Sequence, residues 1–301
     1  MRIIITGKDG QLGFELCRAM TPLGQTVALG RAEMDLAKPE QVVGVIRDLR
    51  PDLIVNAAAY TQVDHAEDEG AVAQAINARA PEILAEEAKR IGARLIHYST
   101  DYVFDGLKRH PYEESDATCP INRYGQSKLA GEQAIVAVGG SHLILRTSWI
   151  YGARGKNFML TILSLAKQRK ELRIVNDQFG VPNWSRAIAE TTRRIVAKWN
   201  SRSHESVAEV SGIFHLSAVG ETNWFEFARA IVKEHRRIGG KQAGDRLALE
   251  RIVPIVSSDY PTAATRPGYS VLSGLKLSRV FAVESGDWRD HLTLAIQDFQ
   301  A

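Results

Sequence analysis

Three glycines directly after the first apolar run restrict the fold of this chain more than any other feature of the sequence. The run IIIT (3–6) has the composition of a buried strand, and TGKDGQLG then contains Gly7, Gly10 and Gly13 at the start of a helical stretch from 11 to 20. Glycine has no Cβ, so the backbone at such a turn comes close to a diphosphate, and the helix start offers unpaired N–H groups. This strand–turn–helix context predicts a dinucleotide-binding unit, with an ordinary glycine-rich turn as the alternative.

The first half of the chain alternates short apolar runs with helical patterns. After the first run come TVALG (26–30), DLIVNAA (52–58), RLIHYS (94–99) and LILRTS (143–148). Strands that alternate with helices are typical of a parallel sheet covered by helices on both faces. The sequence therefore predicts the α/β class, with a Rossmann-type doubly wound parallel sheet.

Strands are fewer from residue 150 onward. LRIV (172–175) and SGIFHLS (211–217) are strand candidates, and residues 222–235 show the pattern of an amphipathic helix with Thr222 as its N-cap. This second half predicts a smaller C-terminal α/β lobe that binds the substrate.

The predicted domain boundaries follow this change in pattern. We expect residues 1–150 plus about 184–216 to form the dinucleotide-binding domain. Residues of about 151–183 plus 217–301 are expected to form the substrate-binding lobe, with a cleft between the two.

Composition and charge exclude several classes of protein. The 301 residues carry a net charge of +3 with Lys and Arg scattered along the chain, so nothing indicates a nucleic-acid-binding surface. No run approaches the ~18 apolar residues of a membrane span, and the N-terminus lacks the apolar stretch of a signal peptide. The two cysteines, Cys17 and Cys119, form neither a disulfide framework nor a CxxC motif. We interpret this as a protein of the reducing cytoplasm.

A tyrosine and a lysine stand four residues apart in RYGQSKLAGE (123–132), a spacing that places both on one face of a helix. Spacing alone is weak support, because one such pair arises easily by chance. The run RLIHYS, however, leads into Thr100, at the strand end that faces a cofactor in a parallel sheet. Thr100 would polarise a substrate carbonyl, Tyr124 would supply a proton, and Lys128 would lower the pKa of Tyr124 and bind the cofactor ribose. Together they predict carbonyl reduction by a nicotinamide cofactor.

The predicted adenosine end of the cofactor lies after the second apolar run, where Arg31 stands in place of an acidic residue. A cation there would neutralise the 2′-phosphate of NADPH, so the sequence favours NADPH and leaves NADH open; a solvated surface arginine is the alternative. Asp35 either approaches the adenine or caps the helix near Pro39, and the small residues 57–59 leave room for the nicotinamide. The residues predicted to contact the cofactor are Gly7, Gly10, Gln11, Leu12, Gly13, Arg31, Asp35, Leu36, Ala57, Ala58, Ala59, Tyr60, Asn77, Ser99, Tyr124 and Lys128.

With these motifs together, the chain resembles the extended short-chain dehydrogenase/reductases, the NAD-dependent epimerase/dehydratase-like family. The strings STDYVFDG, NAAAYTQVDHAE, RTSWIYG, NFM, DQFGVP and RPGYSVL are similar to those of the dTDP-4-dehydrorhamnose reductase family, from residue 2 to about 295. The resemblance implies reduction of the C4 keto group of dTDP-4-dehydro-6-deoxy-L-mannose to dTDP-L-rhamnose with NADPH or NADH. It also implies the last step of dTDP-rhamnose biosynthesis, which serves surface polysaccharides such as the lipopolysaccharide O antigen.

One departure within the superfamily bears on the activity. Related nucleotide-sugar dehydratases carry Thr-Asp-Glu where this chain has Thr100-Asp101-Tyr102, so the acid/base pair that eliminates water is incomplete. Another nucleotide-sugar ketoreductase or an epimerase stays an alternative. So does a non-catalytic regulatory subunit that binds a dinucleotide, because a fold alone does not determine function.

The predicted substrate side of the cleft begins with an arginine. A guanidinium fork suits a diphosphate, and Arg266, followed by the stiffening Pro267, is the first candidate. Trp149 would stack on the sugar, with core packing as the alternative. The resemblance places Asn157 near the nucleotide and Gln178 at the lip of the cleft. The residues predicted to contact the substrate are Thr100, Asp101, Tyr102, Trp149, Asn157, Gln178 and Arg266.

Metal ligands are not predicted from the residues themselves. No HExxH motif or carboxylate cluster is present, and His65 and His97 are interpreted as packing residues. Some members of the resembled family dimerise through carboxylates bridged by magnesium, and Glu15 would belong to such a set. Arg186 stands where a further carboxylate would be needed, which argues against magnesium. A homodimer is expected only by this analogy.

Overall fold

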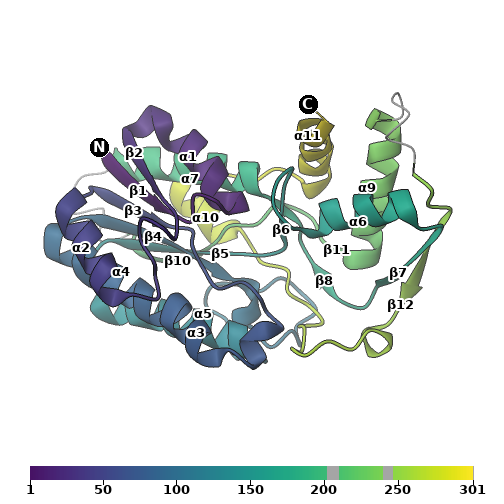
Figure 1. Cartoon of the computed structure of the whole chain (residues 1–301), viewed down its shortest axis with the longest axis horizontal. Helices are drawn as coiled ribbons and strands as arrows, with labels where there is room; N and C mark the ends of the chain where they lie inside the picture. The colour runs from purple at the N-terminus through teal and green to yellow at the C-terminus, as the bar shows by residue number, and fades with distance from the viewer. Residues whose placement is uncertain (202–209, 240–246, 301) are drawn as a thin grey trace.

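Six parallel strands form the central sheet of the computed structural model, which describes residues 1–201, 210–239 and 247–300. The strand order is β10-β5-β4-β3-β1-β2, and each neighbouring pair is parallel (Figure 1). The predicted α/β class and doubly wound sheet are therefore confirmed. The strands are β1 Arg2–Thr6, β2 Gln25–Leu29, β3 Leu53–Asn56, β4 Arg94–Thr100, β5 His142–Thr147 and β10 Gly212–His215.

Helices cover both faces of this sheet, as Figure 1 shows. Alternate residues of a strand point to opposite faces: Ile3 and Ile5 pack with α1, α7 and α10, whereas Ile4 packs with α2, α4 and α5. The short apolar runs of the sequence are buried on both sides for this reason. The helices are α1 Gln11–Met20, α7 Ser185–Asn200 and α10 Leu275–Phe281 on one face, and α2 Pro39–Leu49, α4 Ala80–Ile91 and α5 Arg123–Val138 on the other.

The sheet has its topological switch point at β1, which pairs with β2 on one side and β3 on the other. At such a point the connections that leave neighbouring strands run to opposite faces of the sheet, and a crevice opens outside the carboxyl ends of the strands. The backbone is crowded there: a Cβ on Gly7 would lie 3.0 Å from Cα of Ala58, and one on Gly13 would lie 2.0 Å from the Gly7 carbonyl oxygen. Gly7 also has a φ of +73°, a conformation that favours glycine. The glycine spacing is therefore a requirement of the turn.

A second hydrophobic cluster lies beside the sheet and combines residues from Tyr151 to Trp184 with residues from Ala218 to Ile296. The predicted helix in this region is α9, and the amide of Glu226 donates to the Asn223 side chain, so Asn223 rather than Thr222 serves as the cap. The elements here are α6 Phe158–Gln168, α9 Trp224–Gly239 and α11 Trp288–Gln300, with the strand pairs β6 Ile150–Tyr151 with β9 Asn183–Trp184, β7 Glu171–Val175 with β12 Arg251–Ile255, and β8 Phe179–Gly180 with β11 Thr222–Asn223.

The predicted lobe boundaries differ from this packing at one helix. Leu277 and Phe281 of α10 pack into the sheet cluster, although residues 217–301 were predicted to belong to the other lobe. Strand β10 joins the central sheet, within the predicted segment 184–216. The parts of these predictions at 202–209 and 240–246 lie outside the described residues.

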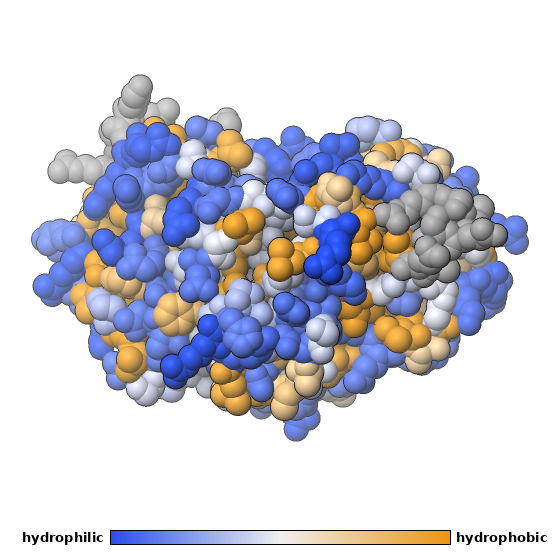
Figure 2. Space-filling view, turned by 180° about the vertical axis from the view of Figure 1, so that it is seen from behind, coloured by the Kyte–Doolittle hydropathy of each residue, from blue (hydrophilic) through white to orange (hydrophobic). Residues whose placement is uncertain are grey.

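Among the residues that the structure describes, no helix is both long and apolar enough to cross a membrane. On the face shown in Figure 2, hydrophobic residues are scattered among hydrophilic ones. Scattered apolar residues of this kind are ordinary on protein surfaces.

Helix α5, which carries Tyr124 and Lys128, is fastened to the sheet by a buried ion pair. The Arg146 guanidinium on β5 donates to both carboxylate oxygens of Glu132, at 2.9 and 2.6 Å, and the side chains are 2% and 1% exposed. Removal of either side chain would leave the other charge buried without a counter-charge, which would destabilise the fold. At the residue before Glu132, a Cβ on Gly131 would lie 2.1 Å from the carbonyl oxygen of Asn77. The backbone of α5 therefore lies close to the backbone of the segment 75–79.

We expect Glu132→Gln to lower the free energy of unfolding by about 3–5 kcal/mol, because it leaves the Arg146 charge buried without a counter-charge. Urea unfolding followed by circular dichroism measures the change. The matched control is Glu190→Gln, which removes an exposed pair with Arg193 and should cost under about 1 kcal/mol. Equal effects of the two substitutions would contradict the role given to the buried pair.

Candidate active site

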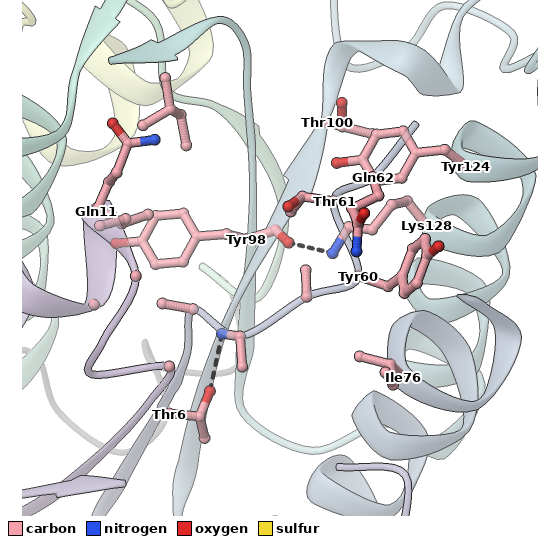
Figure 3. A pocket seen from close by; sticks show the side chains of 18 of the residues that line it. Thr6, Gln11, Tyr60, Thr61, Gln62, Ile76, Tyr98, Thr100, Tyr124 and Lys128 are labelled. Atoms are coloured by element: carbon pink, nitrogen blue, oxygen red, sulfur yellow. Dashed lines mark hydrogen bonds between the residues drawn. The ribbon is translucent and has the colours of Figure 1, made fainter. Parts of the chain in front are cut away.

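A pocket of about 1100 Å³ opens along the carboxyl ends of β1, β3, β4 and β5 (Figure 3). Every residue predicted to contact the cofactor lines it except Asn77. Of the predicted substrate residues, Thr100, Asp101, Tyr102 and Trp149 line the pocket, whereas Asn157, Gln178 and Arg266 are not among its lining residues. The volume exceeds the usual range of ~300–1,000 Å³ for a single small-molecule site. The pocket therefore has room for an extended ligand.

The start of α1 forms one wall of the pocket. Gly10 precedes the helix and provides no side-chain cap, and the first turn contains no acidic residue. The first-turn N–H groups and the helix dipole therefore favour an anion. The close approach of Gly13 to the Gly7 carbonyl keeps side chains away from this wall. These features fit the diphosphate of a dinucleotide.

Arg31 and Asp35 lie at the adenosine end that the sequence predicts. The Arg31 side chain is 84% exposed, and its Nε lies 3.5 Å from Oδ2 of Asp35. The other carboxylate oxygen of Asp35 accepts from the amide of Ala37, so Asp35 stabilises a local turn before α2. Arg31 is therefore held weakly and remains available to a ligand in the pocket.

The segment after β3 is held in place by two buried side chains. The amide of Ala58 donates to Oγ1 of Thr6, at 3.0 Å (Figure 3). Asn77 accepts from the amide of Tyr60 and donates to the Tyr60 carbonyl, at 2.8 and 3.0 Å. Asn77 thus does not line the pocket but shapes the wall that the small residues 57–59 form.

Tyr124 lies in the first turn of α5, two residues after the cap residue Asn122, whose side chain accepts from the amide of Gly125. Burial raises the pKa of Tyr124 to about 12, and a hydrogen bond with the Thr100 hydroxyl opposes this rise. The direction is opposite to the predicted lowering, because burial dominates here and Lys128 is not among the groups that shift this pKa. Tyr124 is therefore protonated at neutral pH, the state that a proton donor requires.

Lys128 lies one turn further along α5, with its side chain 2% exposed. Its Nζ donates to the Tyr98 carbonyl oxygen at 2.6 Å (Figure 3). The same Nζ lies 3.1 Å from Nε2 of His97. Burial lowers the pKa of Lys128 to about 8, and the nearby Glu132 carboxylate opposes this shift. Lys128 therefore titrates close to physiological pH, and its position depends on groups in β4.

Two residues that follow Thr100 also line the pocket, and of these Asp101 is buried and Tyr102 is partly exposed. Burial raises the pKa of Asp101 to about 6, while hydrogen bonds from the Ser270 and Thr100 hydroxyls oppose the rise. The Tyr102 ring contacts the Tyr124 ring edge to face, with centroids 5.6 Å apart. The Asp101 carboxylate therefore carries a cost of burial that a neutral side chain would not.

We expect Asp101→Asn to stabilise the protein above pH 7. The folded-state pKa of Asp101, about 6, is above its ordinary value of 3.8, so wild-type stability falls as pH rises through this window. An asparagine does not ionise, so the variant should gain about 3 kcal/mol at pH 8. Thermal melts at pH 8 and pH 5 check this, and a gain that is equal at both values would contradict it.

Trp149 forms a stacked pair with Trp224 at the far end of the pocket. The ring centroids are 3.5 Å apart with an angle of 10° between the planes, and Trp149 has a φ of +43°. A Cβ on Gly180 would lie 2.6 Å from Cε2 of Trp149, so only glycine leaves room for the ring. Trp149 is thus a wall of the pocket rather than a core residue.

The three predicted substrate residues outside the lining make other contacts. Asn157 caps α6 and donates to Oε1 of Gln11 at 2.8 Å, and Gln178 donates to Ser257. Arg266 binds both carboxylate oxygens of Asp64, at 2.9 and 2.6 Å, so its fork is already occupied in this structure. Its assignment to a substrate diphosphate stays a prediction.

Sequence reasoning missed several lining residues. Trp224 belongs to a helix whose amphipathic pattern gave no sign of a ligand, and only its stacking on Trp149 places it in the pocket. Lys156 also lines the pocket, from the loop that precedes α6. The loop GARGKN (152–157) contains a glycine next to this cation, and that pattern is the signal that was available.

The residues considered for magnesium form an ion-pair network instead. Nε of Arg186 lies 3.0 Å from Glu15, and its Nη2 lies 2.8 Å from Asp298. No group of three or more His, Cys, Asp or Glu side chains suited to a metal occurs in the described parts of the chain. Glu15 is therefore neutralised by a guanidinium.

The fold and site together define an oxidoreductase of the short-chain dehydrogenase/reductase type: a doubly wound sheet with a glycine turn, and a tyrosine, lysine and threonine at its crevice. The family model described as "RmlD substrate binding domain" matches residues 1–301, and the chain belongs to that family.

Individual relatives cover nearly the whole chain. A dTDP-4-dehydrorhamnose reductase from Burkholderia thailandensis is 48% identical over 99% of each chain, and one from Escherichia coli K12 is 43% identical over 96% of this chain and 95% of its own. The crystal structure of dTDP-4-dehydrorhamnose reductase from Bacillus anthracis in complex with NADP has a TM-score of 0.88 and 32% identity, covering 99% of each chain. A UDP-glucose 4-epimerase from Thermus thermophilus, at 18% identity and a TM-score of 0.78, shares the fold.

Proposed function

We propose that this protein reduces the C4 keto group of dTDP-4-dehydro-6-deoxy-L-mannose to give dTDP-L-rhamnose, with NADPH or NADH as the reductant. One observation carries the proposal: Tyr124, whose pKa burial raises to about 12, lines the same pocket as Thr100 and Lys128 at the crevice of a dinucleotide-binding sheet. Similarity over nearly full length to reductases of this name supports the choice of substrate.

The nicotinamide cofactor would supply a hydride to the carbonyl carbon. Tyr124 donates its proton to the carbonyl oxygen. The Thr100 hydroxyl, which donates to Asp101 in this structure, turns its proton to the same oxygen, so negative charge never builds up unpaired. Lys128 binds the ribose hydroxyls of the cofactor and, as an ammonium, stabilises the tyrosinate that remains after proton transfer. Two residues that line the pocket, Ser99 and Thr147, carry buried hydroxyls that have no hydrogen-bond partner among the described residues.

The two ligands divide the pocket between them in this proposal. The cofactor occupies the sheet side, from the glycine turn to Lys128, and the sugar occupies the side closed by Trp149. Arg31 favours NADPH, since it lies at the adenosine end without a strong partner. The domain division at about 151 and 184 and the substrate roles of Asn157, Gln178 and Arg266 belong to the same proposal. We place the enzyme in the cytoplasm because its two cysteines are free thiols. We do not include magnesium because Arg186 neutralises Glu15.

We expect the purified protein to oxidise NADPH only when a dTDP-4-keto-6-deoxy sugar is present. The assay follows absorbance of the reduced nicotinamide with a panel of nucleotide sugars, and the product is identified by mass and NMR. An epimerase would convert its sugar without net loss of NADPH. A regulatory subunit would bind the cofactor and consume none with any sugar of the panel, an outcome that would refute the reductase assignment.

We expect Tyr124→Phe to reduce turnover at least ~10²-fold, because the proton donor is lost while the ring remains. Binding of NADPH, measured by quenching of tryptophan fluorescence, should change little. The control is Tyr260→Phe, which removes the same hydroxyl from an exposed side chain outside the pocket. Undiminished turnover in the Tyr124 variant would remove that residue from the mechanism.

A further inference from the structure

A chain of buried polar side chains runs from the glycine turn to Lys128. Oγ1 of Thr6 lies 2.7 Å from Oδ1 of Asn56, Nδ2 of Asn56 lies 2.9 Å from Nδ1 of His97, and Nε2 of His97 lies 3.1 Å from Nζ of Lys128. All four side chains are at most 2% exposed. These four hydrogen-bonded side chains belong to β1, β3, β4 and α5 in turn. They therefore link the strand before the cofactor turn to the helix that carries Tyr124 and Lys128.

The hydrogen-bond roles along this chain conflict at His97. A neutral imidazole has one N–H donor and one acceptor nitrogen, whereas here an amide nitrogen faces Nδ1 and an amine faces Nε2. Burial and the nearby Lys128 charge hold the pKa of His97 well below its usual range, so the ring is neutral. One of the two neighbours must therefore present an acceptor to the ring.

Only Asn56 can change its role while Lys128 keeps its charge. An ammonium has three donors and no acceptor, but an asparagine amide presents either its oxygen or its nitrogen after a half turn. In the turned arrangement Asn56 accepts from Nδ1–H of His97 and donates to Oγ1 of Thr6. That oxygen has two lone pairs and accepts only one other bond here, from the amide of Ala58. His97, Asn56 and Lys128 then each have a partner of the correct kind, whereas the Thr6 hydroxyl gives up the bond that it otherwise donates to Oδ1 of Asn56.

We propose that His97 is a positioning residue for Lys128: it is held as the neutral tautomer protonated on Nδ1, and its Nε2 accepts from the Lys128 ammonium. The Tyr98 carbonyl accepts a second proton of the same ammonium. The third proton is left for the pocket, which Lys128 lines. The tautomer rests on the contacts of His97 with a turned Asn56 and a charged Lys128, whereas its effect on turnover rests on the proposed reductase function.

The other charged and titratable groups around Lys128 come from three elements. On its own helix, Glu132 favours the ammonium but is itself bound to Arg146 of β5. Asp101 and Tyr124 titrate in the same pocket, at about 6 and about 12. Neither value coincides with the pKa of Lys128 at about 8, so the alkaline limb of a pH–rate profile reports Lys128.

The first test is the tautomer of His97 in the wild-type protein without substrate. The ¹⁵N shifts of its ring nitrogens distinguish the two forms, and the signal is assigned by its disappearance in His97→Gln. We expect a protonated Nδ1 and an unprotonated Nε2 below pH 8. A ring protonated on Nε2 would overturn the proposal, and this result does not depend on whether the protein reduces any sugar.

The second test separates the two ring nitrogens with a matched pair of amides. A glutamine side chain reaches the place of Nε2 and keeps an acceptor for Lys128, whereas an asparagine reaches only the place of Nδ1. Loss of the acceptor destabilises the ammonium, so His97→Asn should move the alkaline limb of kcat down by about one pH unit, and His97→Gln by less than about 0.3. The KM for the sugar should change less than kcat in both.

A purely structural role for His97 gives a different outcome. Both variants place an amide in the same buried site, so a loss of packing would lower the melting temperature and kcat of both while the alkaline limb stays in place. If the alkaline limb of kcat lies at the same pH in His97→Asn, His97→Gln and the wild type, the positioning role is refuted. If the wild type reduces no sugar, the reductase proposal fails and the ¹⁵N result alone decides the state of His97.

Discussion

The close backbone approach at the switch point of the sheet is the constraint on which the rest of this structure depends. Gly7 passes Ala58 so closely that a Cβ would lie 3.0 Å from the Ala58 backbone, and Gly13 meets the Gly7 carbonyl still more closely. These contacts set the entry of α1 and leave its first amides open to the pocket. The carboxyl ends of β3, β4 and β5 meet at the same crevice. The small residues 57–59 and the pair Tyr124 and Lys128 on α5 therefore lie around one pocket, although they are far apart in the sequence.

Around this crevice, the protein keeps charged groups out of water and arranges their partners. Lys128 has a pKa near 8 because its surroundings are dry, and it stays in place through a carbonyl, an imidazole and the buried Glu132–Arg146 pair. Asp101 also carries an unfavourable charge at the same edge. Groups that cost stability are concentrated where the ligands bind, as is usual for functional sites. The sheet and its two hydrophobic layers provide the stability that permits this.

Local pattern was sufficient to predict the sheet, the glycine turn and the helix with Tyr124 and Lys128. Each depends on neighbouring residues: alternation of runs, spacing of glycines, a separation of four. The contacts of Arg266 could not be predicted, because Asp64 lies 202 positions away and competes for the guanidinium only in the folded chain. The raised pKa of Tyr124 depends on burial, which spacing does not reveal. His97 was interpreted as a packing residue for the same reason, since its partners come from β3 and α5.

The stacked indoles of Trp149 and Trp224 have a consequence for spectroscopy. Two parallel aromatic chromophores at 3.5 Å share their electronic excitation, so the pair should contribute a coupled band to the ultraviolet circular dichroism. One ring follows strand β5 of the sheet and the other begins helix α9 in the second cluster. The protein therefore carries an intrinsic optical marker at the junction of its two hydrophobic clusters, and any rearrangement of that junction would be visible without an added label.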